Sequence, residues 1–600
     1  MADWAGTPRE ESGGSVEVDG DDRPDGNPQH DSVEYDHRRL VSLLDEEDLA
    51  LARTPHDARD EAAYSFDPDA DPDSVFPQSV CSGGPTPGGV LLWTRVDPEA
   101  YDPDEPLAVE VAPTPDFEEI VYHGVVDDSE AISAHDHTVK VDLDGRLAPG
   151  ETYHYRFVHG GVASRVGRCR TLPAPDSSPE SVSFAVMTCQ NYANGYYPAY
   201  GYVAEEDVDF IVHVGDFIYE SADGEFKGIG SREYDDRELE LPSGNGHTHT
   251  LADYRYLYRT YRSDRFLQRA LERHTLIPAW DDHEIADDIY WDPDIDAPRA
   301  DHPLSGDPEA MTRLTADAMH TWWEYMPARV RYHPEAEGLQ ERFELWRQFE
   351  FGDLVDLLLT DERLFRDPPK EGVIPTREAV APKYEPADRS MLGDRQREWL
   401  IEEATDGDAL WTVWCDEVLT IPFKLGAGPL TLFPVQGGWD GYVRERREIM
   451  EAFAADDVTN FVTLTGDAHC YIAGYQQTRY DDTLPGLLLG SRVPEAEKVG
   501  VEFMTPTVSS LNVAEALGLN RWKLPDYTEG LLSRLVEACN PHMEFFNSHR
   551  WGYSTVEFTR ENCVWSAYSV DKTENSMDAE RELVKRYRVP EGRVELQEFD

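Results

Sequence analysis

The sequence predicts an α/β protein with a β-sandwich towards its N-terminus and a larger α/β domain after it. Three observations predict this. The first part of the chain alternates short apolar runs with Gly, Pro and Asp turns, which is typical of a sandwich. After residue 181 the pattern changes to buried strands followed by helical stretches, as in an α/β core. Four of those later strands run into side chains of the types that bind metals. These side chains stand at the carboxyl ends of the strands, where α/β sheets bind their ligands.

The composition is that of a large globular protein with a strong excess of acidic residues. The chain has 600 residues, 40% hydrophobic, and at about 100–200 residues per domain this predicts two to four domains. Asp and Glu total 119 against 54 Lys and Arg, for a formal net charge of -65. Such self-repulsion is screened at molar salt, where the Debye length is about 3 Å, so we expect adaptation to high salt. The alternative is an acidic binding surface. The charge argues against docking to nucleic acid or to an anionic membrane.

Cysteine usage and hydropathy restrict the class of protein further. The seven cysteines form no CxxC pair, so they predict neither a disulfide framework nor a zinc cluster. No run of 18 apolar residues occurs, so we expect no transmembrane segment. Arg38-Arg39 precede an acidic stretch instead of an apolar one, which predicts no export signal in this chain. The location expected from this absence is cytoplasmic, or extracellular if the chain is a mature or truncated form.

The chain divides into three parts in order. Residues 1–75 are rich in Asp, Glu, Gly and Pro and predict an acidic, largely disordered arm. Residues 76–173 carry the alternating runs GVLLWTRV, LAVEVA, HTVKVDL and TYHYRFV and predict the β-sandwich. The linker at 172–181 leads to the large domain, residues 181–600. Within it, 221–250 and 291–310 are expected to be loops, and 474–500 an insertion.

The four strand ends predict one polynuclear metal site. SVSFAVMT runs into Cys189, VDFIVHVG into Asp216, TLIPAW into Asp281-Asp282-His283, and NFVTLTG into Asp467-Ala468-His469. Because the carboxyl ends of neighbouring strands meet at one edge, these side chains can converge. Carboxylates, histidines and a thiol together are typical of a centre with more than one metal.

The spacing indicates roles within that site. Asp216 can bridge two metals, and Tyr219, one helical turn later, can reach the same ion. The alternative is a turn aspartate and a core tyrosine. His283 is suited to protonate a leaving oxygen near neutral pH, although a lone histidine is more often a hydrogen-bonded core residue. Asp467 and His469 are close enough to contact both ions.

Three other features carry weaker predictions. Cys470 is expected in the core. Residues 246–249 spell GHTH, but they follow no apolar strand, so we expect a surface loop. Arg363 and Arg366 in DERLFR have planar guanidinium groups that can clamp phosphate, with structural ion pairs as the alternative.

Over residues 76 to 560 the sequence resembles the PhoD family of alkaline phosphatases and phosphodiesterases. The matching segments, in order, are FPQSVCSGGPTPGGVLLWTRV, SFAVMTCQNYANGYYPAY, DVDFIVHVGDFIYE, WDDHEIAD, FGDLVDLLLTDERLFR, MLGDRQREWL, FVTLTGDAH, VEFMTPTVSS and RWGY. The resemblance implies an immunoglobulin- or fibronectin-III-like N-terminal sandwich and a four-layer αββα metallophosphoesterase domain.

The resemblance also implies a ferric ion joined to calcium. Carried over residue by residue, Cys189, Tyr219 and His469 would bind iron, and Asp216 would bridge iron to the second metal. Asp282 and Asp467 would hold calcium, with Asp281 and Asp288 as further candidates. From spacing alone, zinc, manganese or two irons are equally allowed.

The predicted function is a metal-dependent hydrolase of phosphate monoesters, diesters or both, in which metal-bound hydroxide attacks phosphorus in line. The expected substrate is a small-molecule or lipid phosphoester, and the expected state is a monomer. One alternative is a strict phosphodiesterase or a phospholipase D-like enzyme. The other is a catalytically silent surface or adhesion protein.

Overall fold

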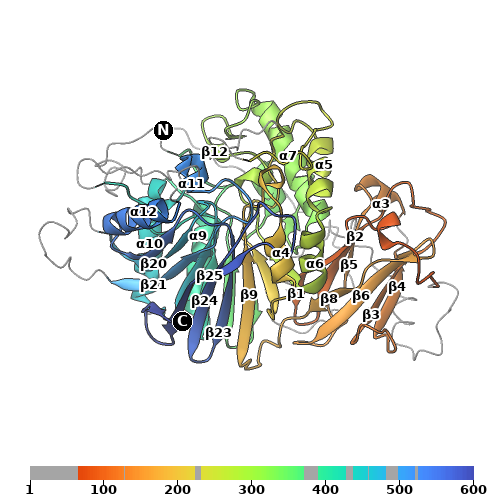
Figure 1. Cartoon of the computed structure of the whole chain (residues 1–600), viewed down its shortest axis with the longest axis horizontal. Helices are drawn as coiled ribbons and strands as arrows, with labels where there is room; N and C mark the ends of the chain where they lie inside the picture. The colour runs from red at the N-terminus through yellow and green to blue at the C-terminus, as the bar shows by residue number, and fades with distance from the viewer. Residues whose placement is uncertain are drawn as a thin grey trace, which may run out of the picture.

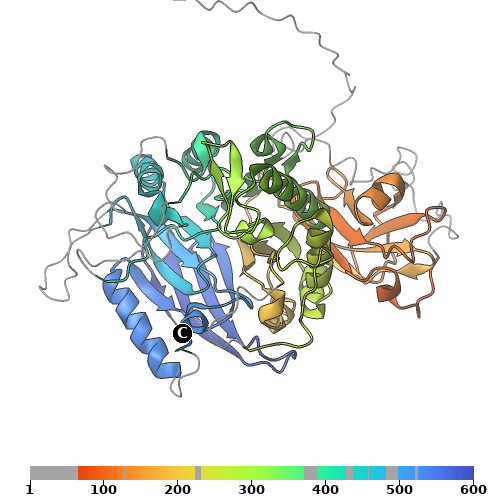
Figure 2. The same cartoon turned by 90° about the horizontal axis from the view of Figure 1, so that it is seen from above.

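The computed structural model describes residues 65–126, 129–222, 232–369, 389–426, 437–456, 458–480, 497–519 and 525–599. It is a mixed α/β structure with several sheets (Figures 1 and 2). Residues 1–64 of the predicted arm, and 481–496 of the predicted insertion, lie outside the described residues. Within the described residues, no helix is both long enough and apolar enough to cross a bilayer.

A ten-stranded sheet carries three of the four predicted strand ends. Its strands, in spatial order, are β26 (Gln597–Glu598), β25 (Arg581–Pro590), β24 (Asn562–Val570), β23 (Gly552–Thr559), β9 (Ser181–Met187), β10 (Phe210–His213), β11 (Thr275–Pro278), β1 (Val80–Thr86), β2 (Gly89–Arg95) and β5 (Thr138–Asp142). The central strands β9, β10 and β11 are parallel, with Phe210 opposite both Phe184 and Thr275. Their carboxyl ends therefore lie side by side at one edge.

A seven-stranded sheet carries the fourth strand end. Its strands, in spatial order, are β16 (Arg347–Phe351), β17 (Val355–Leu359), β18 (Trp411–Cys415), β19 (Phe461–Thr465), β21 (Lys498–Met504), β20 (Tyr471–Gln477) and β22 (Met543–Asn547). Strands β17, β18, β19 and β21 are parallel. All four are buried apart from the first residue of β21, as strands covered on both faces are.

The two sheets pack against each other through aromatic side chains. Phe184 of β9 meets Phe351 of β16 edge to face, with ring centroids 5.2 Å apart. Phe503 of β21 stacks on Trp565 of β24 at 4.9 Å. These contacts belong to one buried hydrophobic cluster that includes residues from both sheets. Such pairs stabilise a core beyond their burial alone.

Helices cover the outer faces of both sheets (Figures 1 and 2). Those beside the ten-stranded sheet are α4 (Pro198–Val203), α5 (Leu251–Tyr261), α6 (Arg265–Arg273) and α7 (Pro308–Tyr325). Those packed on the seven-stranded sheet are α9 (Gly393–Asp406), α10 (Val443–Ala455) and α12 (Pro525–Cys539). Among the described residues, the other α-helices are α3 (Ser129–Ala134), α8 (Leu339–Arg342) and α11 (Val513–Ala516).

The helix starts follow from local sequence. Thr250 and Asp253 form a reciprocal capping box at the start of α5. Asp264 accepts the backbone N–H groups of Phe266 and Leu267 at the start of α6. Asp307 caps α7, whose first residue is a proline.

The N-terminal region shares a sheet with the rest of the molecule. Its second sheet is β4 (Tyr122–Val126), β3 (Leu107–Ala112), β6 (Thr152–His159) and β7 (Val162–Ala163), with β8 (Gly167–Arg170) also paired to β6. Its other strands, β1, β2 and β5, extend the ten-stranded sheet, because β1 pairs in parallel with β11 at Gly83 and Leu276. A Cβ on Gly83 would lie 2.2 Å from the Pro327 carbonyl oxygen, so only glycine allows this approach. Two two-stranded sheets complete the structure, β12 (Tyr290–Asp292) with β13 (Ala297–Arg299) and β14 (Arg331–Tyr332) with β15 (Phe343–Glu344).

Polar contacts also join the N-terminal region to helices α5 and α7. His135 Nδ1 and His320 Nε2 lie 3.1 Å and 2.9 Å from one oxygen of Glu324. Arg255 donates to both oxygens of the same carboxylate. We call His135, His320, Glu324 and Arg255 the junction cluster.

Candidate metal centre

The four predicted strand ends meet at one place. β9, β10 and β11 deliver their following residues from the ten-stranded sheet, and β19 delivers its own from the seven-stranded sheet. Four of the delivered residues have left-handed backbone conformations, namely Cys189 (φ 57°), Asp216 (φ 59°), Asp467 (φ 64°) and His469 (φ 53°). Such conformations are uncommon for residues other than glycine and are concentrated at functional sites.

A glycine lets two of these strand ends approach closely. Gly215 has φ 97°, and a Cβ there would lie 2.4 Å from the Cβ of Asp281. No other residue fits between the ends of β10 and β11. Asp216 therefore emerges directly beside Asp281 and Asp282.

One half of the centre, the thiol half, combines a thiol, a carboxylate, a phenol and an imidazole. Donor atoms of Cys189, Asp216 and His469 all lie within 4.8 Å of one another. The Tyr219 hydroxyl donates to Asp216 Oδ2 at 2.8 Å and lies 3.2 Å from His469 Nε2. His469 Nδ1 donates to the Leu511 carbonyl, so Nε2 keeps a free lone pair towards the centre.

The other half, the carboxylate half, consists of Asp281, Asp282 and Asp467, whose donor oxygens also lie within 4.8 Å of one another. Arg363 is the cation among them. Its guanidinium donates to Asp281, reaches Asp467 at 2.7 Å and lies 3.4 Å from Asp282. Arg363 is 1% exposed, so these ion pairs are shielded from solvent.

The centre has more negative than positive charge. Asp281, Asp282 and Asp467 share the guanidinium of Arg363, and Asp216 and Asp282 adjoin the imidazole of His283, so four carboxyl groups face two cationic groups. Burial raises the pKa of Asp216 to about 7, and burial likewise raises that of Asp281 well above its usual value. Asp216 Oδ1 is buried and accepts no hydrogen bond from the described residues. A buried carboxylate in this state is costly, and bound cations would remove the cost, so the residues present fit a metal centre.

His283 is fixed by a residue that the sequence analysis did not single out. Its Nδ1 lies 2.8 Å from Glu220 Oε2, and since a carboxylate only accepts, Nδ1 carries the proton. The His283 ring packs 4.0 Å from the Tyr219 ring. Burial alone would lower the pKa of His283, but the charges of Asp216, Glu220 and Asp282 raise it well above its usual value. The His283 side chain also adjoins Asp216 and Asp282.

Glu284 is a second residue that sequence reasoning missed. Its carboxylate accepts the backbone N–H groups of Asp216 at 3.0 Å, of Asp281 at 2.7 Å and of Phe217. It therefore joins the ends of β10 and β11. Both glutamates directly follow predicted site residues, in the strings GDFIYE and WDDHE, and that adjacency is the only signal the sequence offers.

The structure places the other predicted residues around the centre. Asp288 lies beside both arginines, 3.8 Å from Arg363 and 3.1 Å from Arg366. Arg366 also donates to the carbonyls of Ile289 and Gly437, so it holds two loops together. Cys470 is buried beside Met504.

The prediction that residues 246–249 form a surface loop is wrong. His247 is 9% exposed and Thr248 is fully buried. The Thr248 N–H donates to the Glu220 carbonyl at 2.9 Å, and Ser221 and His247 form an isolated β-bridge. The segment therefore packs directly behind Glu220. It was misjudged because its burial comes from this long-range pairing and not from an apolar strand of its own.

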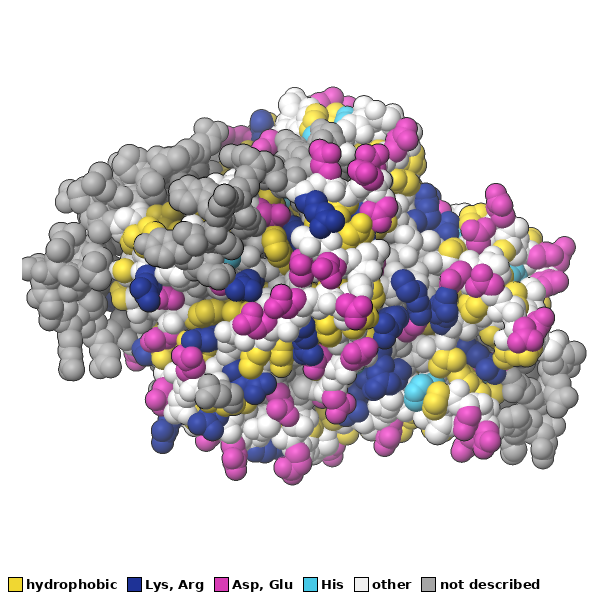
Figure 3. Space-filling model, viewed as in Figure 1, with side chains coloured by type: hydrophobic (Ala, Val, Ile, Leu, Met, Phe, Trp, Pro, Cys, Tyr) yellow, Lys and Arg dark blue, Asp and Glu magenta, His cyan; other side chains and the backbone are white. Residues whose placement is uncertain are grey.

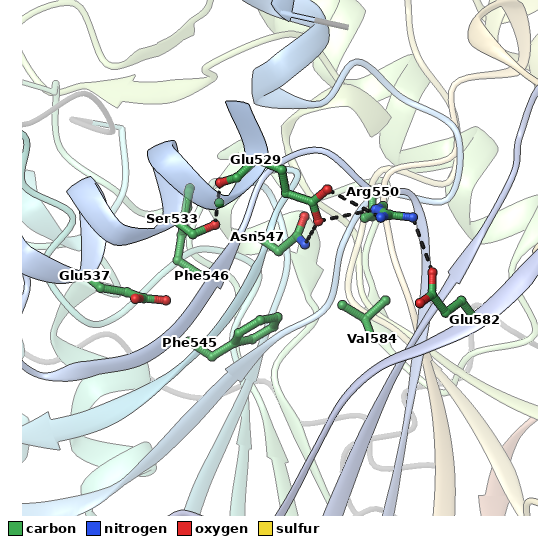
Figure 4. A pocket seen from close by; sticks show the side chains of 10 residues that line it. Glu529, Ser533, Glu537, Phe545, Phe546, Asn547, Arg550, Glu582 and Val584 are labelled. Atoms are coloured by element: carbon green, nitrogen blue, oxygen red, sulfur yellow. Dashed lines mark hydrogen bonds and ion pairs between the residues drawn. The ribbon is translucent and has the colours of Figure 1, made fainter. Parts of the chain in front are cut away.

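One cavity lies apart from the centre, between α12, β22 and β25, and has a volume of about 360 Å³ (Figure 4). Arg550 lies across it, bound to Glu529 on one side and Glu582 on the other. None of the predicted site residues lines it.

Comparisons with known proteins agree with this geometry. The family model described as "PhoD-like phosphatase" matches residues 184–566, and that of its N-terminal domain matches residues 61–173. Alkaline phosphatase D of Bacillus subtilis (strain 168) is 31% identical over 493 residues, which are 80% of this chain and 74% of that protein. A solved structure of PhoD superposes with a TM-score of 0.72 at 26% identity, covering 89% of this chain and 94% of that one. The chain therefore belongs to the PhoD-like phosphatase family and is a phosphoric ester hydrolase.

Proposed function

We propose that this protein is a metal-dependent hydrolase that cleaves phosphate monoesters, diesters or both at the centre described above. The observation that carries the proposal is the convergence of two different donor sets where strand ends of the two sheets meet, with more carboxyl groups than cationic groups. When bound there, metals lower the pKa of water and neutralise phosphate oxygens.

The two donor sets support two different metals. Thiolate, phenolate and imidazole from Cys189, Tyr219 and His469 suit a transition metal, and the proposed ion is ferric iron. Asp282 and Asp467 offer only hard oxygens, which suit calcium. Zinc or manganese is the alternative. Asp216 adjoins both donor sets and is proposed to bridge them.

His283 is proposed to deliver the proton to the leaving oxygen. Glu220 fixes the ring by accepting from Nδ1, which leaves Nε2 as the atom that exchanges a proton with the substrate. The contact of His283 with the Tyr219 ring restricts its rotation further. Precise orientation of this kind is what a general acid requires.

The finer fold predictions are part of the same proposal. Two packed sheets with helices on their outer faces support a four-layer αββα catalytic domain. In the N-terminal region, a single hydrophobic cluster includes Val90 and Val139 of one sheet and Val109 and Phe157 of the other. This supports the sandwich of the immunoglobulin or fibronectin-III type.

Adaptation to high salt is proposed from the charge. On the face seen in Figure 3, acidic side chains are scattered over the surface instead of gathering in one patch. A net charge of -65 distributed in this way needs screening. Dialysis into dilute buffer, followed by far-UV circular dichroism, should show loss of the native signal. A native spectrum without salt would overturn this part of the proposal.

The test of function is hydrolysis of a chromogenic phosphate monoester and the matching diester, side by side, in molar salt with calcium. Turnover of one or both supports the proposal, and their ratio separates a phosphatase from a strict phosphodiesterase or phospholipase D-like enzyme. Lack of turnover of either ester by the metal-loaded protein would favour the catalytically silent surface or adhesion protein.

A further inference from the structure

Two buried glutamates lie behind the carboxylate half, at the carboxyl ends of neighbouring parallel strands. Glu362 follows β17 and Glu417 follows β18, each as the second residue of an Asp-Glu pair. Glu362 is 0% exposed and Glu417 is 1% exposed. Nothing in the proposed chemistry uses either of them.

The two side chains are bound to each other in a reciprocal way. The backbone N–H of Glu362 donates to Glu417 Oε2 at 2.7 Å, and that of Glu417 donates to Glu362 Oε2 at 3.2 Å. The other oxygen of each carboxyl group, Oε1, is buried and has no hydrogen-bond partner among the described residues. Because an ionised carboxylate can only accept, a hydrogen bond between two carboxyl groups requires a proton on one of them.

The surroundings supply too little positive charge for both groups to ionise. Arg363 is already paired with the three carboxylates of the centre, and Arg347 of β16 is a further cation near Glu417. Asp281, Asp361 and Asp416 add further negative charge around the pair. Burial raises the pKa of both glutamates, and the charge of Glu362 raises that of Glu417 further. Two carboxylates in contact under these conditions share one proton.

The pair also links two elements of the centre. Glu362 directly precedes Arg363, whose guanidinium reaches Asp467 at 2.7 Å. The Glu417 carbonyl accepts the N–H of Gly466 at 3.1 Å, directly before Asp467. Separation of the two glutamates would therefore loosen the loop that carries Arg363 and the turn that carries Asp467 together.

We propose that Glu362 and Glu417 form a proton-sharing carboxyl pair that holds Arg363 and Asp467 in place, so that both glutamates are positioning residues for hydrolysis. The pair keeps one negative charge, one shared proton and two backbone hydrogen bonds. The activity part of this inference rests on the proposed function, whereas the presence of the shared proton does not.

The test uses the metal-loaded protein and two substitutions at one position. Glu417→Gln keeps the shape and can donate its amide N–H to Glu362, so the net charge of the pair is unchanged. Glu417→Ala removes the bond. Infrared spectra in D₂O report protonated carboxyl groups by their carbonyl stretch, and kcat is measured on the better of the two chromogenic esters. Glu344→Gln is the control, because Glu344 lies in β15 and is paired with Arg331 and Arg395.

Glu417→Gln is expected to lose intensity in the protonated-carboxyl band and to keep a near wild-type kcat. Glu417→Ala is expected to lower kcat by about 10–100-fold, the usual effect of removing a residue that orients a site. The control should change neither quantity. An unchanged infrared band in Glu417→Gln, or a loss of kcat in Glu417→Gln as large as in Glu417→Ala, would overturn the inference. If the wild-type protein cleaves neither ester, the proposed function fails while the infrared comparison still decides whether the proton is shared.

Discussion

The metal centre and the junction cluster are built from the same kinds of side chain, but they differ in charge balance. In each, three or more donor groups lie within 4.8 Å of one another. In the junction cluster both oxygens of the single carboxylate, that of Glu324, already accept hydrogen bonds from Arg255. In the centre, three carboxyl groups share Arg363 and the fourth, that of Asp216, lies beside His283. Asp216 Oδ1 has no hydrogen-bond partner among the described residues.

The difference shows that convergence of donors does not by itself make a metal site. A cation bound at the junction would meet the charge of Arg255 and would have to displace it. A cation bound at the centre would instead relieve repulsion between buried carboxylates. We therefore expect metal at the centre and hydrogen bonds without metal at the junction, and the following substitutions test that contrast.

Asp216→Ala should have the largest effect, because Asp216 adjoins both halves of the centre. We expect loss of metal and of phosphoesterase activity together, to the background of the assay. Elemental analysis of the purified variant, beside the ester assay, measures both. Asp408→Ala, at an exposed aspartate after α9, is the matched control. Normal metal content and rate in Asp216→Ala would show that the centre has been assigned incorrectly.

His283→Ala should separate catalysis from metal binding. Loss of a positioned acid lowers kcat by about 10²–10⁴-fold, and we expect metal content to stay near that of the wild type. Glu220→Gln should give a smaller loss, about 10–100-fold, because the ring is still bound but less firmly oriented. His154→Ala, in β6 of the N-terminal region, should leave kcat unchanged. A His283→Ala variant with the wild-type rate would exclude its role as the acid.

Tyr219→Phe should change the colour of the protein more than its fold. Phenolate and thiolate bound to ferric iron absorb in the visible, so the concentrated wild-type protein should be coloured and the variant shifted or bleached. Zinc in the same site would give no colour. Tyr256→Phe, at a partly buried tyrosine of α5 that accepts a backbone N–H, is the control. A colourless, fully active wild-type protein that contains only zinc or manganese would contradict the iron assignment.

Glu324→Gln should leave metal content and kcat unchanged and lower stability instead. Removal of one partner of a buried ion pair costs about 3 kcal/mol, measured as the free energy of unfolding in denaturant. Burial opposes ionisation of Glu324, but its bonds with His135, His320 and Arg255 hold its pKa well below the usual 4.5. The stabilisation is therefore complete above pH 4.5 and is lost as the pH falls below it, so the variant and the wild type should converge in acid.

Glu398→Gln, at an exposed glutamate of α9, is the control for this comparison. One metal fewer in Glu324→Gln than in the wild type would show that the junction binds a cation after all. That result would break the contrast on which these predictions depend.

The sequence was sufficient to predict which strand ends meet. The residue that follows a parallel strand always emerges at the carboxyl edge of its sheet, so an apolar strand that runs into a metal-binding side chain places that side chain at this edge. Cys189, Asp216, Asp282 and His469 could all be named on that basis. Their roles as metal ligands stay predictions, as does that of His283. The mixed α/β architecture and the family were predicted correctly.

The residues that were missed act through partners distant in the chain. Glu220 matters because His283 lies against it, and Glu284 because three separate backbone N–H groups point at it. The burial of His247 comes from pairing with the Glu220 segment. The parallel pairing of Gly83 with Leu276 has no local signature either. Contacts of this kind depend on the complete fold and not on any short stretch of sequence.

The ten-stranded sheet also has a consequence for the order in which the protein can assemble during synthesis. Strand β1 leaves the ribosome long before β11 exists, and β9, which ends at Met187, waits for β23, which begins at Gly552. Until then both strands present unpaired edges, on which nascent chains aggregate. Vectorial synthesis therefore delays closure of the sheet until nearly the whole polypeptide has emerged, and a chaperone that shields strand edges would raise the yield of folded protein.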